Sequence, residues 1–201
     1  FIPNKFIDHT HSLALLALAN QPNAEDLCRE IYGSKVAIVP YVMPGFDLAI
    51  EATKAFEKAS MFAKEKQIDL EGMILINHGL FSFGDTAQIS YERMINLVNT
   101  AEKFLKRKIK LDISIPTKKN INTVKILPYL RGLFGRYFSK FGKNNKWIFD
   151  IRNNESTVEL FQKNNLSELV KLGVATPDHV IRTKARPLLL DHFGEKDDID
   201  A

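Results

Sequence analysis

The stretch Lys5-Phe6-Ile7-Asp8-His9-Thr10-His11 decides how the rest of the chain is interpreted. Phe6 and Ile7 favour a strand, and two histidines follow with one residue between them. Side chains at positions i and i+2 point to the same face of a strand, so His9 and His11 would project side by side, about 7 Å apart at the backbone. They could then lean onto one metal ion. The spacing alone is weak support, because such pairs also occur without a metal.

A third histidine strengthens the hypothesis of a metal site. His78 lies in the apolar stretch Met73-Ile74-Leu75-Ile76-Asn77-His78-Gly79-Leu80-Phe81-Ser82-Phe83-Gly84. Catalytic metal sites often combine two close ligands with one distant ligand and keep an open position for water or substrate. We therefore predict a metal site formed by His9, His11 and His78. The two apolar runs around His78 predict two strand pieces with a kink, or one strand with a bulge at Gly79.

Length and composition limit the class of protein. The 201 residues fit one domain, or one domain with a sizeable extension. No apolar run is long enough to span a bilayer and no signal peptide is evident, so we expect no membrane partner. Cys28 is the single cysteine, which fits a cytoplasmic location, and we expect its thiol to be buried and inert. The chain begins at Phe1 rather than Met, which suggests a piece of a longer protein.

The charges are unevenly distributed along the chain. Basic residues dominate from Lys103 to Lys146, and the remainder is acidic on balance. A basic stretch can meet nucleic acid or phosphate, but no nucleic-acid-binding motif accompanies this one. We expect a solvated, partly helical face and no nucleic-acid partner. A smaller basic cluster, Arg182, Lys184 and Arg186, could hold a phosphate, although a solvated strand face is the simpler interpretation.

Periodicity, capping residues and apolar runs predict the other elements. We expect helices over residues 13–19, 24–32, 46–66, 86–106, 123–141 (interrupted around Pro128 and Gly132), 156–162 and 166–172, and strands over 35–40, 108–114, 146–151 and 180–184. Tyr91 is expected to pack in the core. Residues 176–179 are expected to begin a loop, in which His179 beside Asp178 could be a ligand or a base, or simply make one hydrogen bond.

The first half of the chain resembles a known family. Residues 1 to about 107 are similar to the C-terminal half of the class II aldolase/adducin family. The matching motifs are the histidine pair, Val39-Pro40-Tyr41-Val42-Met43-Pro44-Gly45, Asn77-His78-Gly79-Leu80-Phe81-Ser82-Phe83-Gly84 and Tyr91-Glu92-Arg93-Met94. Their combination is specific, whereas each motif alone is weak. The tail, with Trp147-Ile148-Phe149-Asp150 and Thr176-Pro177-Asp178-His179-Val180-Ile181-Arg182-Thr183-Lys184, resembles bifunctional proteins that fuse a rhamnulose-1-phosphate aldolase to a short-chain alcohol dehydrogenase.

The resemblance implies a fold, a cofactor and a reaction. The fold would be α/β, a three-layer α/β/α sandwich with a largely antiparallel sheet over residues 1–112, followed by a mixed extension over residues 113–201 that leads toward a dehydrogenase domain. A divalent ion, usually Zn²⁺, would be held by His9, His11 and His78. It would stabilise the enediolate formed by retro-aldol cleavage of a sugar phosphate, such as a 6-deoxyketohexose 1-phosphate. The resemblance also implies a homo-oligomer.

Departures from the family pattern leave other functions open. The family's acid/base glutamate and phosphate-binding loop would lie before Phe1, so no catalytic residue is assigned and we expect weak or no aldolase activity from this chain alone. No Gly-rich strand–turn–helix motif is present, so we expect no nicotinamide cofactor. The alternatives are a sugar-phosphate epimerase or decarboxylase on the same fold, or a non-catalytic adducin-like assembly module. The three histidines argue against the module.

Overall fold

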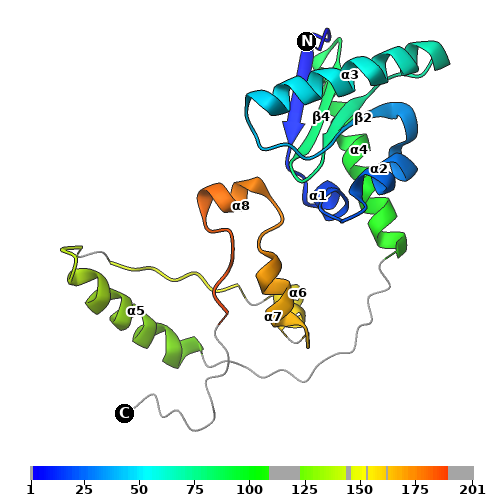
Figure 1. The fold of residues 1–201 in the computed structure, drawn as a ribbon. Coiled ribbons are helices and arrows are strands. Elements are labelled where there is room, and N and C mark those ends of the chain that lie inside the picture. Colours follow the sequence, from blue (N-terminus) through cyan, green and yellow to red (C-terminus); the bar gives the residue numbers. More distant parts are fainter. Residues whose placement is uncertain (1, 109–122, 144–145, 153, 162, 190–201) are drawn as a thin grey trace. The chain divides into compact units, whose positions relative to one another are not determined.

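The structure, a computed structural model, describes residues 2–108, 123–143, 146–152, 154–161 and 163–189 (Figure 1). The chain forms two compact units, one of residues 1–111 and 170–201 and the other of residues 112–169. The predicted domain boundary at residue 112 and the predicted strand at 108–114 lie largely outside the described residues, so both stay predictions. None of the described helices is both long and apolar enough to cross a membrane.

The first unit contains a mixed four-stranded sheet. Its elements are β1 (Phe6–Thr10), α1 (Leu13–Ala19), α2 (Ala24–Tyr32), the short 3₁₀ helix η1 (Gly33–Lys35), β2 (Val36–Val39), α3 (Phe46–Lys66), β3 (Gly72–Leu75), β4 (Gly79–Gly84), α4 (Ala87–Lys108) and α8 (Pro177–Arg182). The strand order is β1-β4-β3-β2. The pairs β1·β4 and β3·β4 are antiparallel, and β2·β3 is parallel. The prediction of a largely antiparallel sheet is therefore confirmed.

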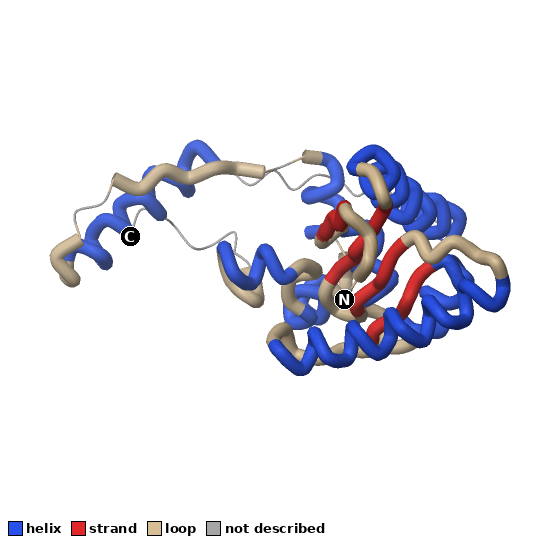
Figure 2. Tube along the Cα trace, turned by 90° about the horizontal axis from the view of Figure 1, so that it is seen from above, coloured by secondary structure: helices blue, strands red, loops and turns tan. Residues whose placement is uncertain are grey.

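Helices cover both faces of this sheet, which gives the three predicted layers (Figure 2). On one face, α3 packs its apolar side onto the strands through Leu48, Ala52 and Phe56. On the other face, α1, α2 and α4 enclose a second cluster that includes Leu15, Cys28 and Leu97. Cys28 has no solvent exposure, as predicted. Burying these apolar side chains on both faces is the main stabilising contribution to the fold.

The chain reverses direction between β3 and β4, so the prediction of a kinked or bulged strand is wrong. Leu75 is paired with Gly79 across the antiparallel hairpin, and the His78 backbone N–H donates to the Leu75 carbonyl at 3.1 Å. Asn77 has a positive φ of 57°, a left-handed conformation that asparagine tolerates better than most residues. Two apolar runs separated by Asn-His therefore form a hairpin, with His78 in its turn.

Helix α4 begins as predicted, but Tyr91 lies outside its buried face. The Thr86 hydroxyl caps the helix by accepting a hydrogen bond from the Ile89 backbone N–H at 3.2 Å. The expectation that Tyr91 packs in the core is wrong, because its side chain is 62% exposed. The buried stripe runs through Ser90, Met94 and Leu97 instead. Tyr91 lies one position, about 100°, around the helix from this stripe.

The second unit is built around α5 (Thr123–Ser139), with α6 (Glu155–Phe161) as predicted and α7 (Leu166–Leu172) at its boundary. The predicted interruption of α5 is absent, since Pro128 lies inside the helix and removes a single backbone donor. The predicted strand over 146–151 is also wrong. This segment pairs with no strand among the described residues, and the Trp147 ring packs 4.8 Å from that of Phe138 on α5.

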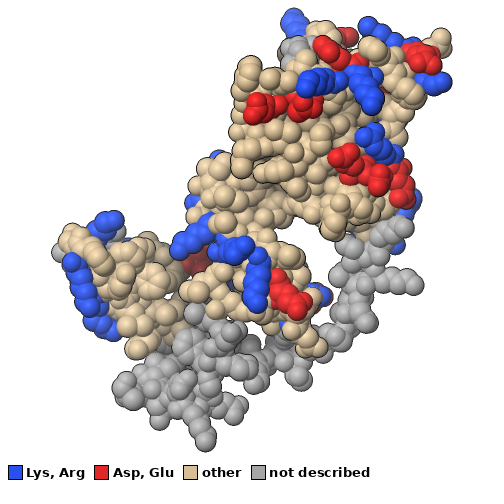
Figure 3. Space-filling model, in the orientation of Figure 1, with Lys and Arg blue, Asp and Glu red and all other residues tan. Residues whose placement is uncertain are grey.

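Figure 3 shows Lys and Arg side chains over α5, which carries no acidic residue.

A short helix replaces the loop and strand predicted over residues 176–184. Helix α8 follows Thr176, whose hydroxyl caps it by accepting from the His179 backbone N–H. Pro177 occupies the first turn, where its missing N–H costs nothing. These N-terminal helix signals outweigh the alternation of residues 180–184 that favoured a strand.

Candidate metal centre

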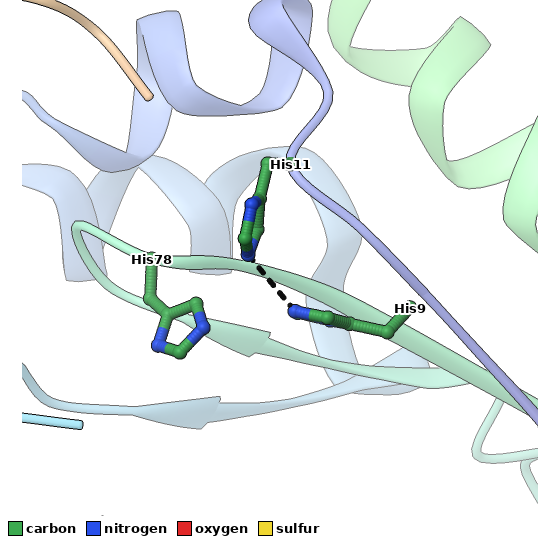
Figure 4. Close-up of side chains that lie close together, drawn as sticks. All are labelled: His9, His11 and His78. Carbon is green, nitrogen blue, oxygen red and sulfur yellow. Dashed lines mark hydrogen bonds between the residues drawn. The ribbon is translucent and has the colours of Figure 1, made fainter. Parts of the chain in front are cut away.

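The strand order brings three histidines of the first unit together. His9 lies on β1 opposite Phe81 of β4, and His11 follows directly after β1. His78 lies in the hairpin turn directly before β4, and β4 is the strand that pairs with β1. Each histidine offers a ring nitrogen, and these atoms all lie within 4.8 Å of one another. Figure 4 shows the three rings converging from β1, the loop after it and the hairpin.

The hydrogen bond of His9 determines which of its ring nitrogens is free. Nδ1 lies 2.9 Å from the Leu80 carbonyl oxygen. A carbonyl oxygen can only accept, so Nδ1 carries the proton and a neutral His9 has a bare lone pair on Nε2. The ring also stacks on Phe81 at a centroid distance of 4.1 Å, which fixes its plane. The His9 ring is therefore held in a fixed orientation with Nε2 free of this hydrogen bond.

His11 is held in the same way by a carboxylate. Its Nδ1 lies 2.6 Å from Oδ2 of Asp178 on α8. The hydrogen bond from His11 lowers the pKa of the Asp178 carboxyl below its usual range, so the carboxylate is ionised and accepts. His11 therefore carries its proton on Nδ1, and Nε2 of the neutral ring is bare.

The two bare nitrogens face each other. Nε2 of His9 and Nε2 of His11 are 3.0 Å apart, the pair joined by the dashed line in Figure 4. Two lone pairs at this separation repel unless a proton or a cation lies between them. Ligand nitrogens of a tetrahedral Zn²⁺ site, with bonds of about 2.0–2.1 Å, are about 3.3 Å apart. The spacing of this pair therefore fits two ligands of one metal ion, with the third histidine within 4.8 Å.

His78 supplies a further sign that the donor set suits a metal. Its Nδ1 atom is buried and has no hydrogen-bond partner in the described part of the chain. Burial is the main reason that the pKa of His78 is lowered from its ordinary value, with the nearby His11 as a second cause. Burial also lowers the pKa of His9, whose ring lies against Phe81. Both rings are therefore neutral near pH 7, the form that binds metals.

Gly79 allows β1 to lie this close to the hairpin. A Cβ atom at this position would lie 2.7 Å from the Thr10 carbonyl oxygen, 2.8 Å from Cδ2 of His11 and 3.0 Å from Cε1 of His9. All three distances are below normal van der Waals contact. The glycine after His78 is therefore part of the site, because any side chain there would displace both histidine rings.

The structure brings the predicted histidine triad together but keeps His179 apart from it. His179 Nδ1 lies 2.6 Å from the Thr176 hydroxyl oxygen, which agrees with the simpler interpretation of one hydrogen bond. Arg182, from the predicted basic cluster, makes an ion pair with Asp178 at 3.7 Å. Sequence reasoning missed the contact of Asp178 with His11. The Thr-Pro-Asp pattern could have revealed α8, but no local signal connects residues 167 positions apart.

Two family models match the chain. The model described as "Class II Aldolase and Adducin N-terminal domain" covers residues 3–105, just over half of the chain. The model described as "Aldolase class II, second domain" covers residues 121–201. The two matches together leave few residues unassigned.

The individual relatives share between 16% and 38% sequence identity with this chain. The chain is 26% identical to an uncharacterized oxidoreductase, YuxG, from Bacillus subtilis over 208 residues, which cover 99% of this chain and 28% of the relative. The chain thus spans less than a third of that relative's length. The N-terminal class II aldolase domain of a conserved Thermoplasma acidophilum protein is 38% identical, with a TM-score of 0.40, over 52% of this chain and 44% of that one. An aldolase II superfamily protein from Pseudomonas syringae is 16% identical, with a TM-score of 0.36, over 67% and 56%.

The matched ranges include every residue of the site just described. His9, His11 and His78 lie within the N-terminal family model, and Asp178 lies within the second-domain model. The motifs that suggested the resemblance, from the histidine pair to the helix with Tyr91, also lie within the first model. The chain belongs to the class II aldolase and adducin family.

Proposed function

We propose that this chain is part of a metal-dependent aldolase that cleaves a carbon–carbon bond of a sugar phosphate, such as a 6-deoxyketohexose 1-phosphate. The observation that carries the proposal is the pair of bare nitrogens on His9 and His11, 3.0 Å apart and beside His78. An assembly module without a metal has no need of such a pair, which costs stability when it is empty. Membership of the aldolase family and the sequence motifs support the reaction class.

The chain's own residues would hold and orient the ion. Three neutral imidazoles contribute no charge, so a divalent ion, expected to be Zn²⁺, would keep its full positive charge. When bound, such an ion supplies Lewis-acid stabilisation of the negative charge that develops on substrate oxygens as the bond breaks. His9 is only partly enclosed and keeps surface open to solvent, so the site can be approached from outside. The proton transfers are assigned to no residue of this chain.

The similarity to a longer relative supports a second part of the proposal. The relative is named an oxidoreductase, and this chain corresponds to 28% of it. We therefore propose that the natural protein joins the aldolase part to a short-chain dehydrogenase. The dehydrogenase could act on an aldehyde or alcohol related to the cleavage product, since one retro-aldol product is an aldehyde.

Metal content is the first test of the proposed site. The purified protein should contain close to one equivalent of a divalent metal by mass spectrometry, and His9→Ala and His78→Ala should each lose it. His192→Ala, a histidine to which the proposal gives no part, is the matched control and should keep the metal. A wild-type protein that neither contains nor binds Zn²⁺ would contradict the enzyme proposal and favour an adducin-like module.

Cleavage is the second test and requires the full-length natural protein. Rhamnulose 1-phosphate should release dihydroxyacetone phosphate, measured as the part of the NADH oxidation that depends on added glycerol-3-phosphate dehydrogenase. The His9→Ala variant should lose the activity. If the full-length protein holds the metal but instead interconverts pentulose phosphates or releases CO₂ from an acid, the reaction would be the epimerase or decarboxylase alternative.

A further inference from the structure

The segment from Gly173 to Ala185 is fastened beside the candidate metal centre, within the same compact unit. Its ends are joined by the Val174 backbone N–H, which donates to the Ala185 carbonyl at 3.1 Å. The Asn20 side chain, just after α1, donates to the Ala175 carbonyl at 2.9 Å. Thr176, which caps α8, is only 5% exposed. These contacts give the first turn of α8 a defined position.

Asp178 in that turn makes a charged contact with the site. Its Oδ2 atom lies 2.6 Å from Nδ1 of His11, and its Oδ1 atom lies 3.7 Å from Nε of Arg182. The His11 side chain is only 20% exposed, so its ring has little freedom once this bond is made. The bond is short even for a hydrogen bond to a charged acceptor.

We propose that Asp178 is a positioning residue of the metal centre, which accepts the Nδ1 proton of His11 and so directs the lone pair of Nε2 toward the metal. The inference rests on the proposed metal site. Metal-binding histidines usually donate their second N–H to a carboxylate or a backbone carbonyl, which fixes the tautomer and the ring orientation. Leu80 provides the carbonyl for His9, and Asp178 provides the carboxylate for His11.

The two family segments are thereby joined in one site. The ligands come from the segment matched by the N-terminal model, and the carboxylate comes from the segment matched by the second-domain model. Without Asp178, the neutral His11 ring could place its proton on Nε2, where it would oppose metal binding, or rotate away from His9. Metal affinity therefore depends on a residue far outside the ligand-bearing segment.

The test measures metal binding and metal geometry rather than catalysis. Zn²⁺ affinity is obtained by competition with a chromogenic chelator, and Co²⁺ is used as a spectroscopic probe because its visible bands report coordination geometry. We expect Asp178→Ala to weaken Zn²⁺ binding about 10–100-fold, the usual effect of losing such a partner, and to change the Co²⁺ bands. Asp178→Glu should restore part of the affinity, since it keeps a carboxylate.

Two control variants separate positioning from charge and folding. Asp150→Ala removes another exposed carboxylate of the C-terminal part, paired with Arg152, and should leave both readouts unchanged. Arg182→Ala removes the long ion pair to Asp178 but not the bond to His11, and should change affinity less than threefold. If Asp178→Ala fails to fold, as seen by circular dichroism, Asp178→Leu, which has a similar shape and no acceptor atom, replaces it, and it should still weaken binding and shift the Co²⁺ bands.

The outcomes separate this inference from the proposal on which it rests. The role of Asp178 would be overturned, while the metal site stood, if folded Asp178→Ala bound Zn²⁺ within threefold of the wild-type affinity and kept the same Co²⁺ bands. The same result with Asp178→Leu, where that variant replaces it, would also overturn the role. A wild-type protein that bound no Co²⁺, or bound it equally well after His9→Ala, would overturn the metal site and this inference together.

Discussion

Replacing Gly79 with alanine should weaken metal binding while leaving the sheet in place. The new methyl group would lie 2.8 Å from Cδ2 of His11 and 3.0 Å from Cε1 of His9. Normal carbon–carbon contact begins at about 3.5 Å, so the His11 ring must move by about 0.7 Å or the backbone must yield. Metal–ligand distances tolerate only about 0.2 Å, so a shift of this size removes His11 from a proper ligand position.

The backbone also resists the change. The methyl group would lie 2.7 Å from the Thr10 carbonyl oxygen, which belongs to the paired strand β1. Overpacking of this kind costs about 1–3 kcal/mol. For a protein of this size, the melting temperature should fall by about 2–12 °C.

Two measurements check this expectation. Thermal unfolding followed by circular dichroism gives the change in stability, and competition with a chelator gives the Zn²⁺ affinity. Gly135→Ala is the matched control, because its new methyl group would meet nothing within 4 Å and it lies inside α5. It should raise helix stability by about 0.5–1 kcal/mol and leave the affinity unchanged. A Gly79→Ala protein with wild-type melting temperature and wild-type Zn²⁺ affinity would refute the reasoning.

Two other predictions follow from the structure and a third from the family resemblance. Burial raises the pKa of the Cys28 thiol to about 11, so at pH 8 a disulfide reagent should modify the unfolded protein but not the folded protein. Fast modification of the folded protein would contradict the burial of Cys28. The pKa values of His9 and His78 are lowered from 6.5, so below that pH the unfolded state binds more protons than the folded state and is favoured. The melting temperature of the metal-free protein should therefore fall as the pH is lowered from about 6.5. The double variant His9→Gln/His78→Gln should show a weaker dependence on pH. We also propose a homo-oligomer, which light scattering would detect as a multiple of 22.9 kDa, whereas a single chain mass would exclude it.

The histidine triad could be predicted from the sequence because its signals are local. The spacing of His9 and His11 requires only a strand, and the apolar runs around His78 indicate strands as well. The pairing of β1 with β4, which brings the two stretches together, joins residues 71 positions apart at His9 and Leu80. Such a pairing leaves no trace in local periodicity, so the sequence suggested the third ligand only by residue type, and the family resemblance strengthened that prediction.

The errors in the predicted fold arose where tertiary contacts or turn chemistry decided the outcome. The reversal at Asn77 depends on a left-handed residue in a turn, whereas the sequence was interpreted as a bulge beside glycine. Tyr91 fits the helical repeat, but α4 is rotated so that this residue faces outward. Residues 180–184 alternate like a strand, yet capping by Thr176 favours the helix that carries Asp178.

The bond between His11 and Asp178 has a consequence for the order of folding. It joins residues 167 positions apart, and the 112–169 unit lies in the intervening chain. The entropy lost on closing so long a loop grows only slowly with its length, so the effect on stability is modest. Contacts between residues far apart in the sequence nevertheless form slowly during folding. The sheet and its hairpin need shorter closures, so they should form first with His11 still free to turn. In a refolding experiment, tight metal binding should therefore appear in a later kinetic phase than the secondary structure.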